Sequence, residues 1–213
     1  RRHKIVLSDQ ARVLQYQVDK SVAEIHEREL ETLSKLAKAG EYRDRTTGNH
    51  LMRMARYSAL IGQNLGLGHK TVHVLEVAAP MHDIGKIGIA DAILLKQGPL
   101  TRDEEDRMKT HPRIGYDILK GSPSKYLSMG AIIALGHHEK YDGSGYPNGL
   151  HGEDIPLVAR VVAVADVFDA LVSERPYKHA WNMDEGIEFL KGQRGKHFDP
   201  TCIDAFLADP TRV

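Results

Sequence analysis

Apolar residues recur at steps of three and four along most of the chain, and this spacing constrains its fold more than any other feature. Such steps place apolar side chains on one face of an α-helix, whereas a half-buried strand requires strict alternation. No alternating run is long enough to predict a strand. The sequence therefore predicts an all-α fold.

The first helical segment is long and stands apart from the rest. A helix is predicted over residues 9–39, with Gly40 as its stop. Two interpretations remain open: the helix packs on its own domain, or it connects to an upstream sensory or receiver domain and pairs with a second copy. Because the sequence begins with Arg rather than Met, we expect a longer protein, with a helical linker at residues 1–40 and a domain at 41–213. The apolar stripe comprises Leu14, Val18, Val22, Ile25, Leu33 and Leu36.

Local signals predict further helices in the second part. Thr101 and Glu104 form a capping-box pattern, and Asp199 is a cap before a first-turn proline. Segment 157–173 contains valines that favour a strand, but its polar residues recur at helical spacing, so we predict a helix. Residues 141–149 contain three glycines and a proline and predict a loop. Helices are predicted at 50–65, 72–82, 101–109, 112–120, 129–138, 157–173 and from 200.

Composition excludes several classes of function. Lys plus Arg and Asp plus Glu both number 29, so the balanced charge argues against a nucleic-acid polymer or a membrane surface as partner. No segment is long and apolar enough to predict a transmembrane helix. The single Cys202 excludes an intrachain disulfide and fits a reducing, cytoplasmic compartment. The 12 histidines point to nitrogen and oxygen ligands for any bound metal.

Histidines and carboxylates scattered over separate helices form the candidate site. His82-Asp83 offers a neutral nitrogen and an anionic oxygen near a helix end, and a carboxylate can bridge two cations. Singly, each residue is better explained by a cap, a hydrogen-bonded core histidine or an ion-paired aspartate. Jointly, they favour a centre that holds two metal ions. The set is His50, His82, Asp83, His111, His137, His138 and Asp166.

These motifs resemble a known family. His82-Asp83 resembles the signature of the HD phosphohydrolase superfamily. With Gly145-Tyr146-Pro147 (the GYP loop) inside segment 137–147, the chain closely resembles the HD-GYP family over residues 42–207. The resemblance implies an HD-domain helical bundle and a bacterial signalling phosphodiesterase that hydrolyses cyclic di-GMP to linear pGpG, and slowly on to GMP. It also implies that the seven residues above are the metal ligands.

The resemblance implies roles for further residues and partners. Asp83 would bridge the two ions, and Lys86 would lie beside the scissile phosphate, which makes these two the catalytic residues. Arg175 and Lys178 match positions that hold phosphate or guanine groups, and Tyr146 lies near the substrate entrance. The ions are divalent transition metals, Fe or Mn before Ni or Zn. Implied partners are cyclic di-GMP, an upstream regulatory domain, GGDEF-domain proteins that contact the GYP loop, and a second copy paired through the N-terminal helix.

One position departs from the family pattern. Members with three metals have a Glu one helical turn before the first histidine ligand, where this chain has Thr46. A neutral hydroxyl is a poor ligand for a hard cation, so we predict two ions. The same change motivates an alternative function, a sensor that binds cyclic di-GMP with low turnover. A further alternative is an HD phosphohydrolase that acts on another nucleotide, although the GYP loop and the Arg175/Lys178 pair argue against it.

Overall fold

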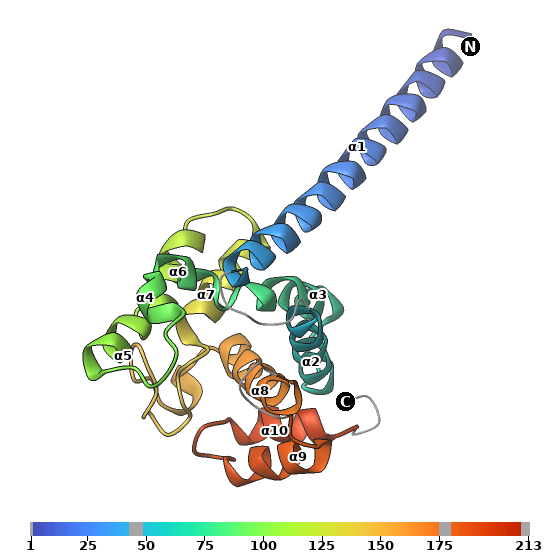
Figure 1. Cartoon of the computed structure of the whole chain (residues 1–213). Coiled ribbons are helices and arrows are strands. Elements are labelled where there is room, and N and C mark those ends of the chain that lie inside the picture. Colours follow the sequence, from blue (N-terminus) through green and yellow to red (C-terminus); the bar gives the residue numbers. More distant parts are fainter. Residues whose placement is uncertain (1, 43–48, 175–179, 210–213) are drawn as a thin grey trace. The chain divides into compact units, whose positions relative to one another are not determined.

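The computed structural model describes residues 2–42, 49–174 and 180–209, with side chains from residue 10 onward (Figure 1). The regular secondary structure of these residues is helical, and their only β-type pairings are two isolated bridges. The predicted all-α fold is therefore confirmed. The chain divides into two compact units, Arg1–Lys35 and Leu36–Val213.

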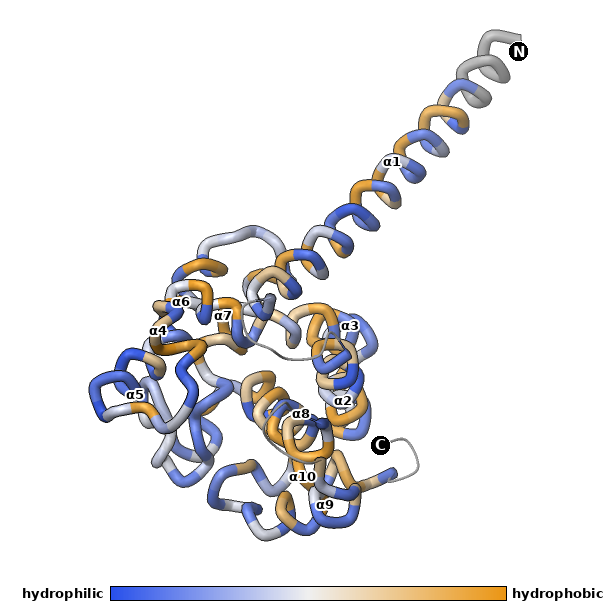
Figure 2. The backbone as a smooth tube through the Cα atoms, in the orientation of Figure 1, coloured by the Kyte–Doolittle hydropathy of each residue, from blue (hydrophilic) through white to orange (hydrophobic). Residues whose placement is uncertain are grey.

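The first unit is formed by most of one helix, α1 (Arg2–Glu41). This helix includes the predicted segment 9–39 and extends beyond it at both ends. Gly40, predicted as the stop, lies within the helix, which ends one residue later at Glu41. Hydrophobic and hydrophilic residues are interspersed along α1 (Figure 2), and Leu14, Val18, Val22 and Ile25 are 55–65% exposed. Across the described ranges, no helix has the length and apolar character needed to cross a bilayer.

The second unit contains all the helices predicted after α1. Helix α3 ends earlier than the spacing through His82 suggests, because Pro80 interrupts the α-helical hydrogen bonds and the chain continues as a 3-10 turn, η1. Two helices, α4 and α9, were not predicted. The described α-helices are α2 (His50–Asn64), α3 (His69–Ala78), α4 (Asp91–Leu94), α5 (Arg102–Met108), α6 (His111–Leu119), α7 (Lys125–Gly136), α8 (Leu157–Val172), α9 (Met183–Gly192) and α10 (Pro200–Leu207). The 3-10 turns are η1 (Ala79–Met81), η2 (Ile84–Gly88) and η3 (Gly152–Asp154).

Both predicted helix caps are present. The Thr101 hydroxyl accepts a hydrogen bond from the Glu104 amide, and the Glu104 carboxylate accepts one from the Thr101 amide at 2.7 Å. The Asp199 carboxylate accepts a hydrogen bond from the Thr201 amide at 2.7 Å, which caps α10. These contacts satisfy amide groups that the first helical turn leaves unpaired.

Helix α8 forms the centre of the core. It contacts α2, α7, α9 and α10, and its residues Val161, Val162 and Val164 are fully buried. A helix surrounded on several sides must be apolar almost all round, which explains why this segment looked similar to a strand in sequence. By packing between α2 and α7, α8 aligns the elements that carry the candidate histidines.

Candidate metal centre

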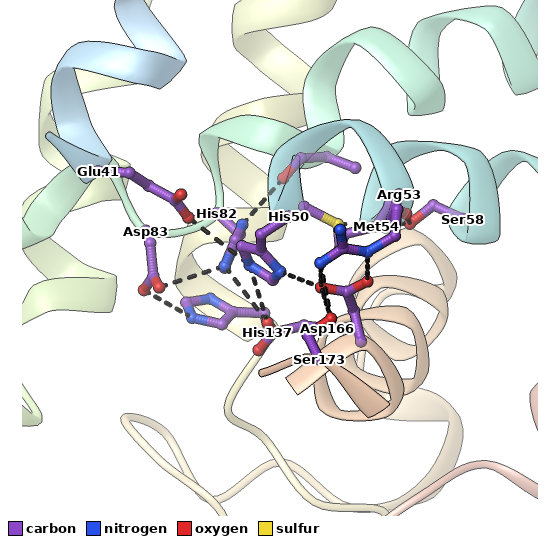
Figure 3. A network of polar contacts seen from close by, with 12 residues as sticks. Glu41, His50, Arg53, Met54, Ser58, His82, Asp83, His137, Asp166 and Ser173 are labelled. Carbon is purple, nitrogen blue, oxygen red and sulfur yellow. Dashed lines mark hydrogen bonds and ion pairs between the residues drawn. The ribbon is translucent and has the colours of Figure 1, made fainter. Parts of the chain in front are cut away.

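The seven predicted metal-site residues come from five parts of the second unit and lie in one region, part of which Figure 3 shows. Each lies at a helix end or a tight turn except Asp166, which projects from the middle of α8. The elements are the first residue of α2 (His50), the junction of η1 and η2 (His82 and Asp83), the first residue of α6 (His111), the segment just after α7 (His137 and His138), and α8 (Asp166).

The Asp83 carboxylate lies between histidines from different elements. Its Oδ2 is 3.2 Å from Nε2 of His82. Its Oδ1 is 3.2 Å from Nε2 of His111 and 3.5 Å from Nε2 of His137. The two oxygens of one carboxylate therefore face two sets of imidazoles, which is the arrangement that a bridging carboxylate requires.

The donor atoms form two groups, within each of which all atoms lie within 4.8 Å of one another. The first, the Asp83 group, is Asp83, His111, His137 and His138. The second, the Glu41 group, is Glu41, His50 and His82. Asp166 borders the Glu41 group, with Oδ1 3.5 Å from Nε2 of His50 and 3.8 Å from Nε2 of His82. The structure thus places the predicted residues together as two adjacent groups.

Backbone carbonyls orient three of the imidazoles. Nδ1 of His82, His111 and His137 lies 3.2, 2.8 and 3.0 Å from the carbonyl oxygen three residues earlier in the chain. We assign the proton to Nδ1, since a carbonyl can only accept a hydrogen bond. In the neutral ring, which is the form that binds metal, Nε2 then carries the lone pair and faces the other members of the centre.

A carboxylate orients the fourth imidazole. His50 Nδ1 lies 2.6 Å from Oδ2 of Asp169, whose side chain is fully buried. Arg53 donates two hydrogen bonds to the same carboxylate, at 2.5 and 2.9 Å, and Ser173 donates another at 3.3 Å. Burial would raise the pKa of Asp169, but the contacts with His50 and Arg53 outweigh it and lower the pKa. Asp169 is therefore an anion that fixes the ring of His50.

The electrostatics differ among the buried imidazoles. Burial lowers the pKa of His137 and His138, which keeps both rings neutral and able to bind a cation. Burial acts the same way on His82, but the Asp83 carboxylate outweighs it and raises the pKa of His82 to about 9. For Asp83, burial is opposed by Lys86 and His82, and its pKa lies well below the usual value. A cation bound at His82 would therefore displace a proton.

Two buried atoms indicate that the centre needs a cation. Among the described residues, Nε2 of His82 and Oδ1 of Asp83 are buried without a hydrogen-bond partner. Burying such atoms unsatisfied is costly, and a divalent ion would satisfy both. Imidazole nitrogens combined with carboxylate oxygens suit divalent transition metals. The residues present therefore fit a metal centre.

A glycine permits the close approach that forms the Asp83 group. A Cβ atom at Gly85 would lie 1.9 Å from the carbonyl oxygen of His111 and 2.5 Å from the Gly115 amide nitrogen. Only glycine allows η2 and the start of α6 to approach this closely. In the same turn, Lys86 Nζ lies 2.7 Å from Oδ2 of Asp83, which places a positive charge at the edge of the centre.

The GYP loop lies against the Asp83 group. The ring of Tyr146 stacks on His138, with centroids 4.7 Å apart and planes 23° apart. The loop is fixed by the buried carboxylate of Glu139, which accepts hydrogen bonds from the amides of Asn148 at 2.8 Å and Leu150 at 3.0 Å. Sequence analysis did not identify this role of Glu139, although the residue directly follows the His137-His138 pair.

Three predicted residues lie outside the described part of the chain, and two residues at the centre were not predicted. Arg175 and Lys178, predicted to bind substrate, lie outside the described residues, as does Thr46. Two acidic side chains at the centre were not predicted: Glu41 as a member of the second group, and Asp169 as the partner of His50. Asp169 is three residues after Asp166 on α8, so the helical spacing offered a signal for its proximity. No comparable local signal points to Glu41.

Comparison with known proteins agrees with this geometry. A family model described as the HD domain matches residues 20–202, most of the sequence. The chain belongs to the HD domain family. The predicted HD recognition is therefore confirmed, and the His82-Asp83 pair at the middle of the centre matches the dipeptide that gives the family its name.

Two curated relatives cover most of this HD domain. The chain is 58% identical over 187 residues to the cyclic di-GMP phosphodiesterase response regulator RpfG of Xanthomonas campestris. This match covers 88% of the chain and 50% of the relative. It is 47% identical over 177 residues to a cyclic di-GMP phosphodiesterase of Thermotoga maritima, covering 83% of the chain and 48% of the relative. The chain thus spans about half the length of these relatives.

A solved structure has the same fold. The crystal structure of a cyclic GMP-AMP specific phosphodiesterase of Vibrio cholerae matches with a TM-score of 0.65 and 20% sequence identity. The match covers 86% of the chain and 49% of that structure. At this identity the likeness supports the helical HD bundle.

Proposed function

We propose that this chain hydrolyses cyclic di-GMP to linear pGpG in bacterial signalling, with two divalent metal ions as cofactors. The observation that carries the proposal is Asp83, whose two oxygens face His82 on one side and His111 and His137 on the other. The names of the two curated relatives support the substrate. Fe and Mn are the first candidates, with Ni and Zn as alternatives.

The residues of the centre suit phosphodiester hydrolysis. When bound, two divalent ions lower the pKa of water and neutralise charge on the phosphate. Asp83 and the histidines, oriented through Nδ1, hold this machinery in place. Lys86, 2.7 Å from Asp83, supplies a fixed positive charge where negative charge grows as one P–O bond of the ring breaks.

Substrate contacts are assigned to three side chains. Tyr146, stacked on His138, places an aromatic face next to the Asp83 group, where a guanine base could stack. Arg175 and Lys178 would bind phosphate or guanine groups, an assignment supported by the Arg175-Pro176-Tyr177-Lys178 motif. Release of pGpG, with slow further hydrolysis to GMP, is the expected outcome.

The test is a product assay on protein loaded with Mn²⁺ or Fe²⁺. Cyclic di-GMP should be converted to pGpG, detected by chromatography, and a chelator should abolish the conversion. Cyclic di-AMP, cyclic GMP-AMP and linear nucleotides serve as competitors, and preference for cyclic di-GMP is expected. Faster hydrolysis of an ordinary mononucleotide would instead favour an HD phosphohydrolase with another substrate.

A low-turnover sensor of cyclic di-GMP is the second candidate, favoured by Thr46 at the position of an acidic residue in members with three metals. Single-turnover measurements separate the two functions. Tight binding of cyclic di-GMP to the metal-loaded protein without pGpG would identify the sensor.

Partners and location are part of the proposal. The exposed stripe at Leu14, Val18, Val22 and Ile25 supports pairing of α1 with a second copy, and a charged substitution at Val18 should then shift the protein to monomer in sedimentation. The length of the relatives supports an upstream regulatory domain. GGDEF-domain proteins are proposed to contact the GYP loop, and the single cysteine supports a cytoplasmic location.

A further inference from the structure

The last turn of α1 brings a carboxylate to the metal centre. Glu41 ends the helix, is 7% exposed, and belongs to the second unit. Its Oε1 lies 3.7 Å from Nε2 of His50, and Figure 3 shows the side chain directed towards His50 and His82. One donor atom from each of these three residues lies within 4.8 Å of the other two.

Three features of this position act against an anion. A buried carboxylate carries a desolvation cost. The carboxyl end of a helix bears a partial negative charge, which further disfavours Glu41 at the end of α1. A second acidic side chain approaches the same point, since Oδ1 of Asp166 lies 3.5 Å from Nε2 of His50. A cation among these side chains would offset all three effects.

The neighbouring histidine points to the same conclusion. Nε2 of His82 is buried without a hydrogen-bond partner among the described residues, and it belongs to the Glu41 group. Nε2 of His50 faces Glu41, because its Nδ1 is occupied by Asp169. Two imidazole nitrogens and one carboxylate therefore converge on one point, a donor set that suits a divalent transition metal.

We propose that Glu41 is a ligand of the metal bound by His50 and His82. The family resemblance implies a carboxylate at the position of Thr46 in members with three metals, and here a carboxylate would be supplied from the end of α1 instead. The inference rests on the proposed function in that it assumes a metal centre, and it agrees with two ions, one in each group. Metal occupancy is then linked to the position of the last turn of α1.

The experiment measures Mn²⁺ binding to the full chain by calorimetry, with metal content determined independently. Glu41→Gln keeps the shape, removes the charge and replaces the carboxylate by an amide, whose single neutral oxygen is a weaker ligand. It should weaken one of two Mn²⁺ sites about tenfold or more, the scale seen when a metal site loses a supporting group. Glu41→His supplies a neutral ligand and should restore most of the affinity. Glu31→Gln, at an exposed position on the same helix, should bind as the unaltered chain does.

The outcomes separate the two proposals. If the unaltered chain binds no Mn²⁺, both the proposed function and this inference fail. If it binds two ions and Glu41→Gln binds both equally well, the inference alone is overturned. Equal weakening in Glu41→Gln and Glu41→His would also overturn it, because Glu41 would then act through its charge. Circular dichroism of the metal-free variants confirms that each is folded.

Discussion

Two clusters of buried charge in this molecule differ in how completely their polar atoms are satisfied. Around Asp199, the carboxylate accepts hydrogen bonds from the amide and hydroxyl of Thr201 at 2.7 and 2.8 Å and forms an ion pair with Arg160. Arg160 also donates to the carbonyl of Ile155 at 2.8 Å. In the metal centre, by contrast, Nε2 of His82 and Oδ1 of Asp83 are buried without a hydrogen-bond partner among the described residues.

This difference indicates that the charged residues around Asp199 stabilise the fold, whereas those of the metal centre serve function. The Asp199 cluster joins α8 to the start of α10 and needs no ligand to balance its charges. In the metal centre, the charges of Asp83, His82 and Lys86 balance one another, but Nε2 of His82 and Oδ1 of Asp83 lack a hydrogen bond that a bound cation would replace. Substitutions in the first cluster should therefore change stability, and those in the second should change metal binding and catalysis.

The largest effect is expected from Asp83→Ala. Because Asp83 contacts histidines from both groups, its loss should remove metal and lower the hydrolysis rate by about a thousandfold, the scale of a lost principal electrostatic contribution. Metal analysis and the pGpG assay measure both effects. Circular dichroism should still show a folded helical domain. Normal hydrolysis by this variant would contradict the proposed mechanism.

Substitution in the other cluster should give the opposite result. Asp199→Ala removes the cap of α10 and leaves Arg160, whose side chain is 13% exposed, without its carboxylate partner. The free energy of unfolding should fall by about 3 kcal/mol, as for other broken buried pairs. Urea denaturation of the metal-free protein measures this. Mn²⁺ binding should be unchanged. A loss of metal in this variant would contradict the claim that the Asp199 cluster serves stability alone.

Lys86→Ala tests charge at the edge of the centre. The side chain contacts Asp83 but is a cation, so it contributes no ligand to a metal. The rate should fall about a hundredfold while metal content is retained, because only transition-state charge is left unstabilised. Steady-state kinetics beside metal analysis separate the two quantities. Loss of metal in proportion to rate would assign Lys86 a structural role.

Asp169→Asn tests the orientation of His50. The amide keeps the shape but weakens the hydrogen bond to Nδ1 and the pairing with Arg53. Metal affinity should fall about tenfold to a hundredfold, as for other partners of metal-binding histidines. Arg53→Lys is the matched control, since it keeps a cation near Asp169, and it should bind Mn²⁺ nearly normally. Equal affinity in Asp169→Asn would show that His50 is oriented by packing alone.

Sequence reasoning succeeded where the signal is local. Helical spacing predicted the fold, and the Thr101 and Asp199 caps were read from their own neighbours. Helix α9, which was not predicted, begins with an equivalent capping box formed by Asn182 and Glu185. The local sequence therefore contained a signal for this helix as well. The seven histidines and aspartates of the centre were found because the HD dipeptide and the GYP loop are specific motifs.

The missed residues depend on tertiary packing. Asp166 and Asp169 are the same residue type, three positions apart on α8, yet one lies beside the Nε2 atoms of two histidines and the other binds Nδ1 of His50. Only the packing of α8 on α2 distinguishes them. Glu41 resembles any other acidic residue at the end of a charged helix, and only the folded chain brings it to His50. A local sequence pattern does not predict contacts between residues that are distant in the sequence.

One residue from each cluster, His82 and Asp199, should respond to pH in opposite directions. In the metal-free protein, the Asp83 carboxylate raises the pKa of His82 to about 9 against the effect of burial. A raised pKa contributes stability that is complete below the unfolded pKa of about 6.5 and is lost as the pH rises through the folded value. Metal-free protein should therefore lose stability between neutral pH and about pH 9. Saturating Mn²⁺ should remove this dependence, because a metal-bound imidazole carries no proton at that nitrogen.

Asp199 should cause a smaller loss of stability, at acidic pH. Burial would raise its pKa, but the Thr201 hydrogen bonds and the Arg160 guanidinium outweigh it and lower the pKa. Because the unfolded chain then takes up the proton first as the pH falls, the contribution is complete above about pH 4 and is lost as the pH falls through the folded pKa. Urea denaturation gives the free energy of unfolding of the unaltered chain and of Asp199→Asn at each pH. The difference between the two should be constant from pH 5 to 7. Below that range it should shrink, by about 1 kcal/mol in total for each unit by which folding lowers the pKa of Asp199. A constant difference down to pH 3 would mean that the Asp199 carboxylate stabilises the fold by shape rather than by charge.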